Sequence, residues 1–270
     1  MKRMWSLIRH LVQLAVLALF LSSLTGWHGV IGTLSASRIF GISLADPFAV
    51  LQIVFAQHRL TSTLGFAALW ILLAYWILGG RTFCGWICPV NTLLEPIDYL
   101  RKRFNLPDVN LGVRTKYWVL VIVLILSLIL GIPAFEVISP IGILLRNLLY
   151  GFGLSFVFIL ILIGFELTVS RRGFCRYLCP LGAFYGLIGR ISPLQVRLQA
   201  KSCIHCGQCA AVCPMGEAPL QKALEGKSPR LDASECIKCA KCIEICPTRA
   251  IQPEIIGIQP QKPEQTIDLK

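Results

Sequence analysis

Charged side chains are scarce in this 270-residue sequence, at 15% of residues, whereas hydrophobic side chains make up 55%. A soluble domain usually carries about 25% charged residues, so the scarcity of charge argues against an ordinary soluble protein. The abundance of apolar side chains argues against a disordered chain, because disordered segments are poor in them. The composition therefore predicts a chain that lies largely within a lipid bilayer.

The motifs of several enzyme classes are also missing. The sequence has no phosphate-binding loop, no Gly-rich dinucleotide fingerprint and no nucleophile motif, so it predicts neither nucleotide nor hydrolytic chemistry. Only 4 His are present, and His10, His28 and His58 show no paired spacing inside an apolar run. This scatter argues against a b-type haem, which needs axial ligands from the chain.

Four apolar runs are long enough to cross a hydrocarbon core, which takes about 20 residues. They predict transmembrane helices near residues 10–27, 62–80, 117–138 and 151–170. The first run is long and lacks a clear small-residue cleavage site, so we interpret it as an uncleaved span and not as a signal peptide. The segment 39–57 is apolar but is interrupted at Asp46-Pro47. Because Pro disfavours helix at the residue before it, we predict a re-entrant or interfacial segment at the outer face.

Basic residues give the chain a formal charge of +12 and border the apolar runs. Thirteen lie on one predicted side of the membrane: Lys2, Arg3, Arg9, Arg81, Arg101, Lys102, Arg103, Arg114, Lys116, Arg171, Arg172, Arg176 and Arg190. Only Arg38, Arg59 and Arg146 lie on the other. The positive-inside rule therefore places both termini and the 81–116 loop in the cytoplasm. No nucleic-acid partner is predicted, because the charges flank apolar spans and do not gather on a soluble face.

Eight of the 12 cysteines form two C-x2-C-x2-C-x3-C-P runs near the C-terminus. This is the bacterial ferredoxin spacing for [4Fe–4S] clusters, in which the fourth Cys of each run ligates the other cluster. The first cysteine set is therefore predicted to be Cys203, Cys206, Cys209 and Cys246, and the second cysteine set Cys236, Cys239, Cys242 and Cys213. Structural zinc is the competing interpretation, since four-cysteine zinc sites also use C-x2-C pairs. Two complete runs, each ending in Pro, favour iron–sulfur chemistry.

The other four cysteines belong to an internal repeat of the form R-x-F-C-x-aromatic-aliphatic-C-P, found at residues 81–89 and 172–180. Each copy follows an even-numbered apolar run, which predicts two related helix pairs. We name Cys84, Cys88, Cys175 and Cys179 the four edge cysteines, because they lie at the predicted membrane edge. They could jointly hold an additional iron–sulfur cluster or metal, act as redox dithiols, or be inert buried residues. The duplication favours a joint cluster or redox site.

These features predict a membrane all-α fold with three parts. Residues 1–190 form a four-helix transmembrane domain that carries both C-x3-C-P motifs. Residues 191–255 form a small 2[4Fe–4S] ferredoxin-type α+β domain, and residues 256–270 form a C-terminal tail. Cluster binding is expected to stabilise the small domain, because metal binding supplies folding free energy in such modules.

Over nearly its whole length the sequence resembles the NapH family of ferredoxin-type membrane proteins and, more broadly, polyferredoxin-like quinol dehydrogenases. The resemblance rests on the four spans, both C-x3-C-P motifs, the eight-cysteine tail, the stretch 32–37 and Asp46-Pro47. It implies a multi-pass protein of the bacterial inner membrane that takes electrons from the quinone pool. It also implies delivery of those electrons toward a periplasmic iron–sulfur partner and a periplasmic nitrate reductase system, in nitrate respiration.

The quinol-binding residues are not identified by the sequence. Glu136 and Glu166 lie near span ends and His28 and His58 on the outer side; intramembrane ionisable groups are functional candidates by default. Glu166 could equally pair with Arg171 or Arg172. Two other functions stay open: a redox-sensing or metallocentre-assembly membrane ferredoxin, and a related quinol dehydrogenase that serves another reductase.

Overall fold

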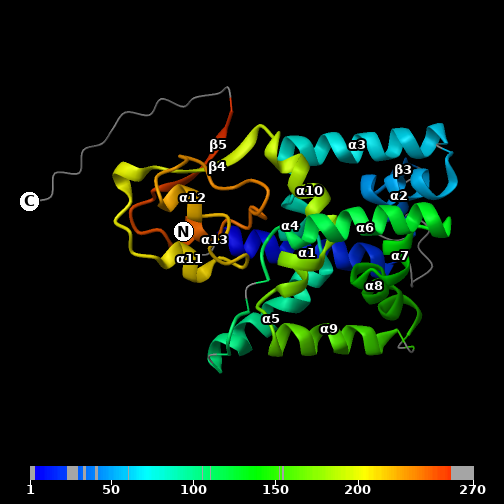
Figure 1. Ribbon diagram of the computed structural model, residues 1–270, viewed down its shortest axis with the longest axis horizontal. Coiled ribbons are helices and arrows are strands. Elements are labelled where there is room, and N and C mark those ends of the chain that lie inside the picture. Colours follow the sequence, from blue (N-terminus) through cyan, green and yellow to red (C-terminus); the bar gives the residue numbers. More distant parts are fainter. Residues whose placement is uncertain are drawn as a thin grey trace, which may run out of the picture.

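The structure, a computed structural model, describes residues 4–22, 30–32, 35–39, 42–59, 61–104, 106–109, 111–151, 153 and 155–256. It is mostly helical, as predicted. Figure 1 shows the apolar helices gathered at one end of the molecule and the small C-terminal domain at the other. The start of the first helix reaches into that domain. His28 lies outside the described residues.

The helical part consists of two halves in which the same order of elements recurs. The first half contains α1 (Met4–Leu21), α2 (Pro47–Gln57), α3 (Ser62–Leu78), α4 (Thr82–Trp86) and α5 (Pro89–Arg103). The second contains α6 (Thr115–Leu130), α7 (Ala134–Ile138), α8 (Pro140–Tyr150), α9 (Phe156–Thr168), the π-helix η2 (Phe174–Leu178) and α10 (Pro180–Arg190). Three short antiparallel strands, β1 (Val30–Gly32), β2 (Ala36–Ile39) and β3 (Ile42–Ala45), form a small sheet before α2.

Proline starts the corresponding short helices in both halves. The Asp46 side chain accepts a hydrogen bond from the backbone N–H of Ala49 before α2, and Ser139 does the same from Gly142 before α8. Proline suits the first helical position because its fixed φ is helical and its missing N–H would have no partner there. The Cys-Pro of each C-x3-C-P motif starts α5 and α10 in the same way.

The two halves exchange helices. Helix α5 of the first half packs against α8 and α9 of the second, whereas α10 of the second half packs against α3 of the first. Both α2 and α10 also pack against α6. The helix that follows each C-x3-C-P motif thus contacts the opposite half, and α10 also packs on α6 of its own half. These contacts bring the two motifs together in the core of the helical part.

The predicted spans correspond to apolar helices of different lengths. Among the described residues, α1 is long and apolar enough to cross a membrane by length and composition, and α2, α3, α6 and α9 are shorter apolar helices. The run 117–138 does not form one helix, because α6 ends at Gly131 in a left-handed conformation before Pro133. The segment 39–57 forms β3 and the buried helix α2. The number of membrane crossings stays a prediction.

Six of the basic residues that the sequence analysis counted as charges at the membrane edge are buried in the protein: Arg9, Arg81, Arg101, Lys116, Arg172 and Arg176. They bind carboxylates and backbone carbonyls of distant segments. Arg101, for example, donates to the carbonyl oxygens of Glu166, Leu167 and Pro107. The positive charge therefore joins segments within the protein as well as marking the predicted cytoplasmic edge.

The C-terminal domain is built on a two-stranded antiparallel sheet of β4 (Leu194–Leu198) and β5 (Ile251–Ile255), with Leu194 opposite Ile255 and Leu198 opposite Ile251. Four short helices lie between the strands: η3 (Ala200–Ser202), α11 (Gln208–Val212), α12 (Gln221–Leu224) and α13 (Lys241–Ile245). Its core of seven buried residues is small and is completed by partly buried cysteines. A domain with so few apolar contacts is expected to depend on its metal groups for stability.

Candidate iron–sulfur sites

The two ferredoxin-type loops have the same backbone conformation at matching positions. His205 and Gly207 flank Cys206 with positive φ, and Lys238 and Ala240 flank Cys239 in the same way. Left-handed residues on both sides of the middle cysteine curl the loop tightly, although this conformation is unfavourable for a residue other than glycine. Each loop brings its first three cysteines to the lining of one cavity.

Two separate cavities are lined by the two predicted cysteine sets. The smaller one is lined by the first cysteine set, together with His205 and Gly207. The larger one, of about 480 Å³, is lined by the second cysteine set. The fourth cysteine of each run thus lies at the other run's cavity, which is the exchange that the ferredoxin spacing predicts. The assignment of a cluster to each set stays a prediction.

The donor set fits iron–sulfur clusters better than single metal ions. Within the described part of the chain, no three Cys, His, Asp or Glu side chains converge closely enough to hold one ion. A cubane separates its four thiolate ligands, because each binds a different iron atom. A structural zinc ion needs four ligands at about 2.3 Å from one centre. Four cysteines that line one cavity are compatible with a cluster, whose iron atoms hold the thiolates apart.

The four edge cysteines meet in the core of the helical part. Cys88 and Cys179 are buried, and Cys84 and Cys175 pack against the same hydrophobic cluster. The thiol of Cys88 lies within electrostatic range of Cys84 and Cys179, and that of Cys175 within range of Cys179 and Cys88. The two copies of the repeat thus bring their thiols to one place. The geometry is compatible with one site shared by all four thiols. In the helical part that the structure describes, the two pairs of edge cysteines do not form two separate dithiol sites.

Buried cations surround the four edge cysteines. The first Arg of each motif lies beside the first thiol of the same motif, so that Arg81 interacts with Cys84 and Arg172 with Cys175. Arg81 also donates to the backbone carbonyl of Cys175, at 3.0 Å. Positive charge around thiols stabilises their deprotonated form, which is the form that binds metal. Burial nevertheless raises the pKa of Cys84 and of Cys175, and Arg81 and Arg172 offset that rise only in part.

Glu166 does not pair with Arg171 or Arg172, which corrects one of the sequence-based interpretations. Its carboxylate is buried and accepts hydrogen bonds from the backbone N–H groups of Gly173 and Phe174, both at 2.9 Å. These donors start the turn that carries Cys175, so Glu166 holds the second motif in place. Glu136 is half-buried on α7, and His58 ends α2 in a left-handed conformation. Neither contacts the cysteines.

The first motif lies directly against the loop of the second cysteine set. A side chain at Gly85 would overlap the carbonyl oxygen of Ile237, which lies between Cys236 and Cys239. The indole of Trp86 donates to the carbonyl of Lys238, at 2.9 Å. Cys84 itself packs against a small cluster that contains Ile237 and Cys239. The edge cysteines and the second cysteine set are therefore neighbours.

A buried ion triad fixes this contact. Glu235 accepts from Lys116 at 2.5 and 2.6 Å and from Arg81 at 3.3 Å. Arg81 also donates to the carbonyl oxygens of Ser234 and Glu235, at 3.1 and 3.2 Å. Two cations from the helical part thus hold one carboxylate next to Cys236. The sequence analysis missed this triad, because nothing in the local spacing relates residue 235 to residues 81 and 116.

A second polar junction joins the N-terminal helix to the C-terminal domain. Glu95 on α5 receives hydrogen bonds from Arg9 at 2.6 Å, His10 at 3.1 Å and Lys241 at 2.5 Å. Burial alone would raise the pKa of Glu95, but the hydrogen bond and charge of Lys241, together with Arg9, outweigh it and lower the pKa to about 2. The carboxylate stays ionised at neutral pH. The backbone N–H of Ser6 on α1 donates to Glu244 on α13, at 3.0 Å, and adds to the junction.

Comparison with known protein families identifies iron–sulfur sequences in both parts of the chain. A family described as "4Fe-4S binding domain" matches residues 61–107 and 150–199, the segments that contain the edge cysteines. A family described as "4Fe-4S dicluster domain" matches residues 195–247. These matches show a ferredoxin-type iron–sulfur protein. No solved structure matches the chain.

Named relatives cover most of the chain. The methylamine utilization ferredoxin-type protein MauN of Paracoccus denitrificans is 37% identical over 214 residues, which is 78% of this chain and 76% of MauN. The ferredoxin-type protein NapH of Escherichia coli is 33% identical over 231 residues, 83% of this chain and 80% of NapH. NapH of Haemophilus influenzae is also 33% identical, over 81% of this chain and 77% of that protein. The chain therefore belongs to the family of ferredoxin-type iron–sulfur electron-transfer proteins that contains NapH and MauN.

Proposed function

We propose that this protein is a multi-pass membrane quinol dehydrogenase subunit that passes single electrons from quinol through iron–sulfur clusters to a partner protein. The observation that carries the proposal is the contact between two cysteine sites. Cys84 of the edge group and Cys239 of the second cysteine set pack against the same cluster, and Ile237 touches Gly85. A redox site at the membrane edge thereby adjoins a redox site of the C-terminal domain.

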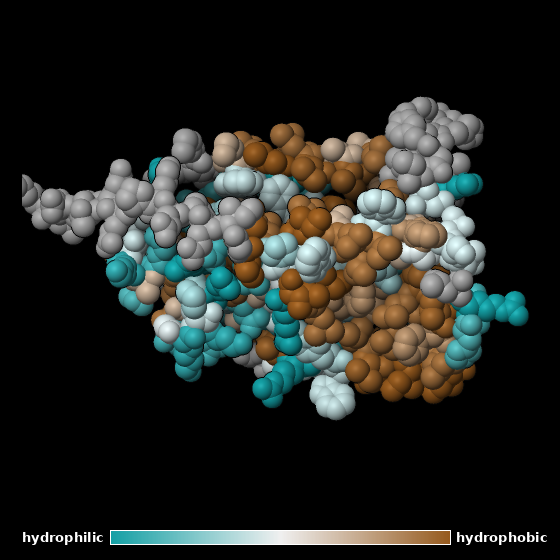
Figure 2. All heavy atoms as spheres, turned by 90° about the horizontal axis from the view of Figure 1, so that it is seen from above, coloured by the Kyte–Doolittle hydropathy of each residue, from teal (hydrophilic) through white to brown (hydrophobic). Residues whose placement is uncertain are grey.

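Membrane embedding is supported by the surface of the helical part. Trp70, Ile129, Phe66 and Ile161 on α3, α6 and α9 each expose more than 60% of their surface. Figure 2 shows apolar residues gathered over the helical end and polar residues over the C-terminal domain. Large exposed apolar areas mark membrane or protein contacts. We propose that α1, α3, α6 and α9 cross the inner membrane and that both termini lie in the cytoplasm.

Two [4Fe–4S] clusters on the first and second cysteine sets, and a further iron–sulfur site on the four edge cysteines, would supply one-electron redox chemistry. Oxidation of one quinol leaves a quinone, two electrons and two protons, and the protons pass to water at the membrane edge. The chain holds the edge cysteines and the second set in contact through the triad at Glu235. The first set, with Cys206 exposed, lies where a soluble partner could reach it.

The partner that the resemblance to NapH suggests is a periplasmic iron–sulfur protein of a nitrate reductase system. The comparable identity with a methylamine utilization protein favours a second candidate, in which the same electron transfer serves that process. The first set is proposed to be cytoplasmic, whereas the nitrate reductase is periplasmic. The side of the membrane on which the C-terminal domain lies therefore decides whether electrons must cross the membrane to reach this partner. Reporter fusions after residue 60 and at the C-terminus test it: a periplasmic signal from the C-terminal fusion would overturn the proposed topology.

Quinol oxidation is tested on the full chain in membranes, with its clusters assembled and under anaerobic conditions. Added decylubiquinol should bleach the cluster absorbance and produce the EPR signal of reduced iron–sulfur clusters. A preparation with full iron content that shows no response, in the presence of its electron-accepting partner, would instead favour a redox sensor or assembly protein.

A further inference from the structure

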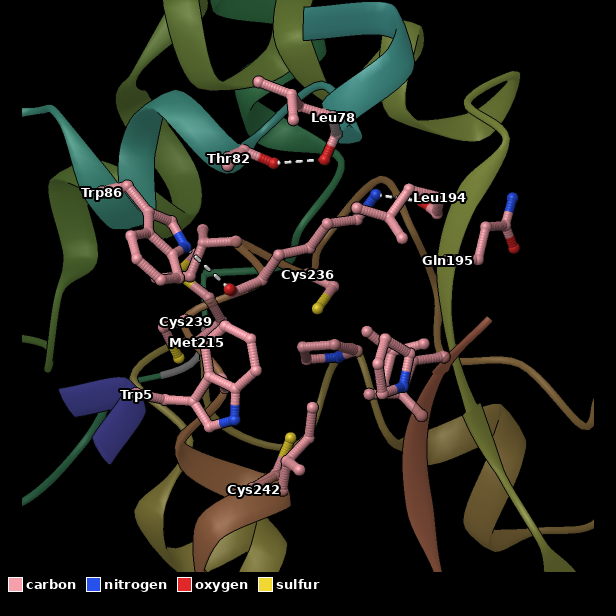
Figure 3. A pocket seen from close by; sticks show the side chains of 18 of the residues that line it. Trp5, Leu78, Thr82, Trp86, Leu194, Gln195, Met215, Cys236, Cys239 and Cys242 are labelled. Atoms are coloured by element: carbon pink, nitrogen blue, oxygen red, sulfur yellow. Dashed lines mark hydrogen bonds between the residues drawn. The ribbon is translucent and has the colours of Figure 1, made fainter. Parts of the chain in front are cut away.

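The cavity at the second cysteine set, of about 480 Å³, is far larger than the cavity of about 20 Å³ at the first set, although each set has four cysteines. Its remaining lining comes from other elements, including Trp5 of α1, Leu78 of α3, Thr82 and Trp86 of α4, and Leu194 of β4. Figure 3 shows Leu78 and Thr82 at the end of the cavity opposite Cys242. One end is therefore formed by cysteines, and the other by the junction of α3, α4 and the C-terminal domain.

The shape and lining of the cavity suit a flat apolar molecule. Its volume of about 480 Å³ lies in the usual range of small-molecule sites, roughly 300–1,000 Å³. Two indoles, Trp5 and Trp86, pack directly against each other edge to face, with their ring centres 6.3 Å apart, and together form one aromatic wall of the cavity. Such aromatic walls bind planar rings, because stacked and edge-to-face ring pairs are favourable.

Two polar groups lie at the cysteine-free end. The Thr82 hydroxyl donates to the carbonyl of Leu78, at 2.7 Å, so its oxygen lone pairs can still accept a hydrogen bond from a ligand hydroxyl. The Lys238 ammonium donates to the carbonyl of Leu194 and retains two further donors for a ligand oxygen. A hydroquinone carries the matching hydroxyl groups.

Two residues that line the cavity also belong to the apolar surface of the helices. Leu78 is 47% exposed and Trp5 39% exposed, although both line the cavity. Their exposed helical neighbours Ile77 and Ile8 continue the apolar surface along α3 and α1. A long hydrocarbon tail attached to a ring inside the cavity could thus leave between these two helices into the membrane.

We propose that this cavity binds the head group of a lipid-soluble quinol, with Thr82 and Lys238 facing its hydroxyl groups and Trp5 and Trp86 packing on its ring. The proposal rests on the proposed function and adds the place where quinol binds. A ring held there lies beside Cys236 and Cys239, so electrons would enter the second cysteine set directly.

The test uses Leu78→Trp, which places a large ring at the entrance, in full-length protein reconstituted in phospholipid nanodiscs with its clusters. Leu73→Trp is the matched control, because Leu73 is on the same helix, is 41% exposed and does not line the cavity. We expect Leu78→Trp to weaken binding of decylubiquinone by roughly tenfold, with the iron content of both variants unchanged. Thr82→Val keeps the side-chain shape and should weaken binding roughly fivefold, through loss of one hydrogen-bond acceptor.

Photolabelling with an azido derivative of decylubiquinone, followed by peptide mass spectrometry, gives a readout that does not depend on turnover. Label on peptides containing Trp5, Leu78 or Trp86, removed by excess decylubiquinone, supports the proposal. Label elsewhere, with cluster reduction by quinol intact in Leu78→Trp, overturns the binding site but leaves the proposed function standing. Label at the cavity from a photoactivatable phospholipid that decylubiquinone does not displace shows a lipid chain there and overturns the site. The absence of both binding and cluster reduction in the unaltered protein overturns both proposals.

Discussion

The arginine that opens the first copy of the repeated motif forms an ion pair with the C-terminal domain, whereas the arginine that opens the second copy forms one within the helical part. In the first copy, Arg81 binds Glu235 of the C-terminal domain. In the second, Arg172 binds Asp98 at 2.5 Å and also Asn91, both on α5. Equivalent arginines thus support different neighbours. The comparison shows that the repeat builds a near-symmetric cysteine site and that one side of it is specialised to hold the ferredoxin-type domain.

The fifth residue of the motif also differs between the two copies. Gly85 of the first copy is replaced by Arg176 in the second. The absent side chain of Gly85 lets the loop at Ile237 approach closely. Arg176 instead reaches Asp108 at 2.9 Å and lies against Gly216, just after Cys213. Both copies therefore approach the C-terminal domain near the second cysteine set, the first through a close backbone approach to Ile237 and the second through the long side chain of Arg176 beside Gly216.

The largest effect is expected from breaking the triad on the first side. Glu235→Gln leaves Arg81 and Lys116 buried without a counter-charge, which is expected to cost about 3–5 kcal/mol, as for other broken buried pairs. The C-terminal domain should detach from the helical part, with faster proteolytic cleavage near residue 191. Asp98→Asn is the matched change in the second copy and should loosen α5 while the domain stays attached. Equal cleavage rates in the two variants would contradict the proposed specialisation.

A joint site on the edge cysteines predicts a non-additive loss of iron. Cys84→Ser removes a ligand from the first copy and Cys175→Ser one from the second. If the two copies share one cluster, each single variant and the double variant should lose the same amount of iron per chain, because one missing thiolate already disrupts the cluster. Metal analysis of purified protein measures this. An iron content equal to that of the unaltered protein would mean that the thiols hold no iron.

A side chain added at Gly85 tests the contact between the first copy and the C-terminal domain, and an intermediate loss of stability is expected. Gly85→Ala forces the motif and the Ile237 loop apart, and overpacking of this kind typically costs about 1–3 kcal/mol. We expect a weaker magnetic interaction between the edge site and the second cysteine set in EPR spectra of the reduced protein. Gly164→Ala on α9 is the control, because nothing lies within 4 Å of the added atom. An unchanged interaction in Gly85→Ala would exclude this contact as the link.

The smallest effect is expected at Glu95, which contacts both the N-terminal helix and the C-terminal domain. Its depressed pKa means that the ionised form stabilises the folded state fully above the ordinary value near 4.5, and that this stability is lost as the pH falls from about 4.5 to about 2. Glu95→Gln should therefore lower stability by the same amount at pH 8 and pH 9, a range above the usual titration of imidazoles, by about 1 kcal/mol after screening of a side chain that is 23% exposed. Thermal unfolding at both pH values measures it. A destabilisation that differed between them would assign the effect to another group.

The cysteine chemistry was predictable because it is encoded locally. The spacing of the cysteines from Cys203 to Cys246 predicts the ligand loops without any knowledge of the surrounding structure. The two copies of the C-x3-C-P motif can likewise be recognised as a repeat from the sequence alone. The helix exchange was not predictable, since it depends on which apolar faces fit together. The triad at Glu235 joins residues more than 100 positions apart. The sequence analysis counted Arg81 and Lys116 as edge charges because their distant partner could not be seen.

The exchange of α5 and α10 between the halves also governs how the protein is made. When Cys84 and Cys88 leave the ribosome, α9, on which α5 packs, has not yet left it. The edge site can close only after α10 has returned to α3, and the ferredoxin-type domain, which docks on Arg81, follows it in the chain. A metal group shared by the two motifs, as proposed, could therefore be bound by all four thiols only after the second half of the helical part has been made.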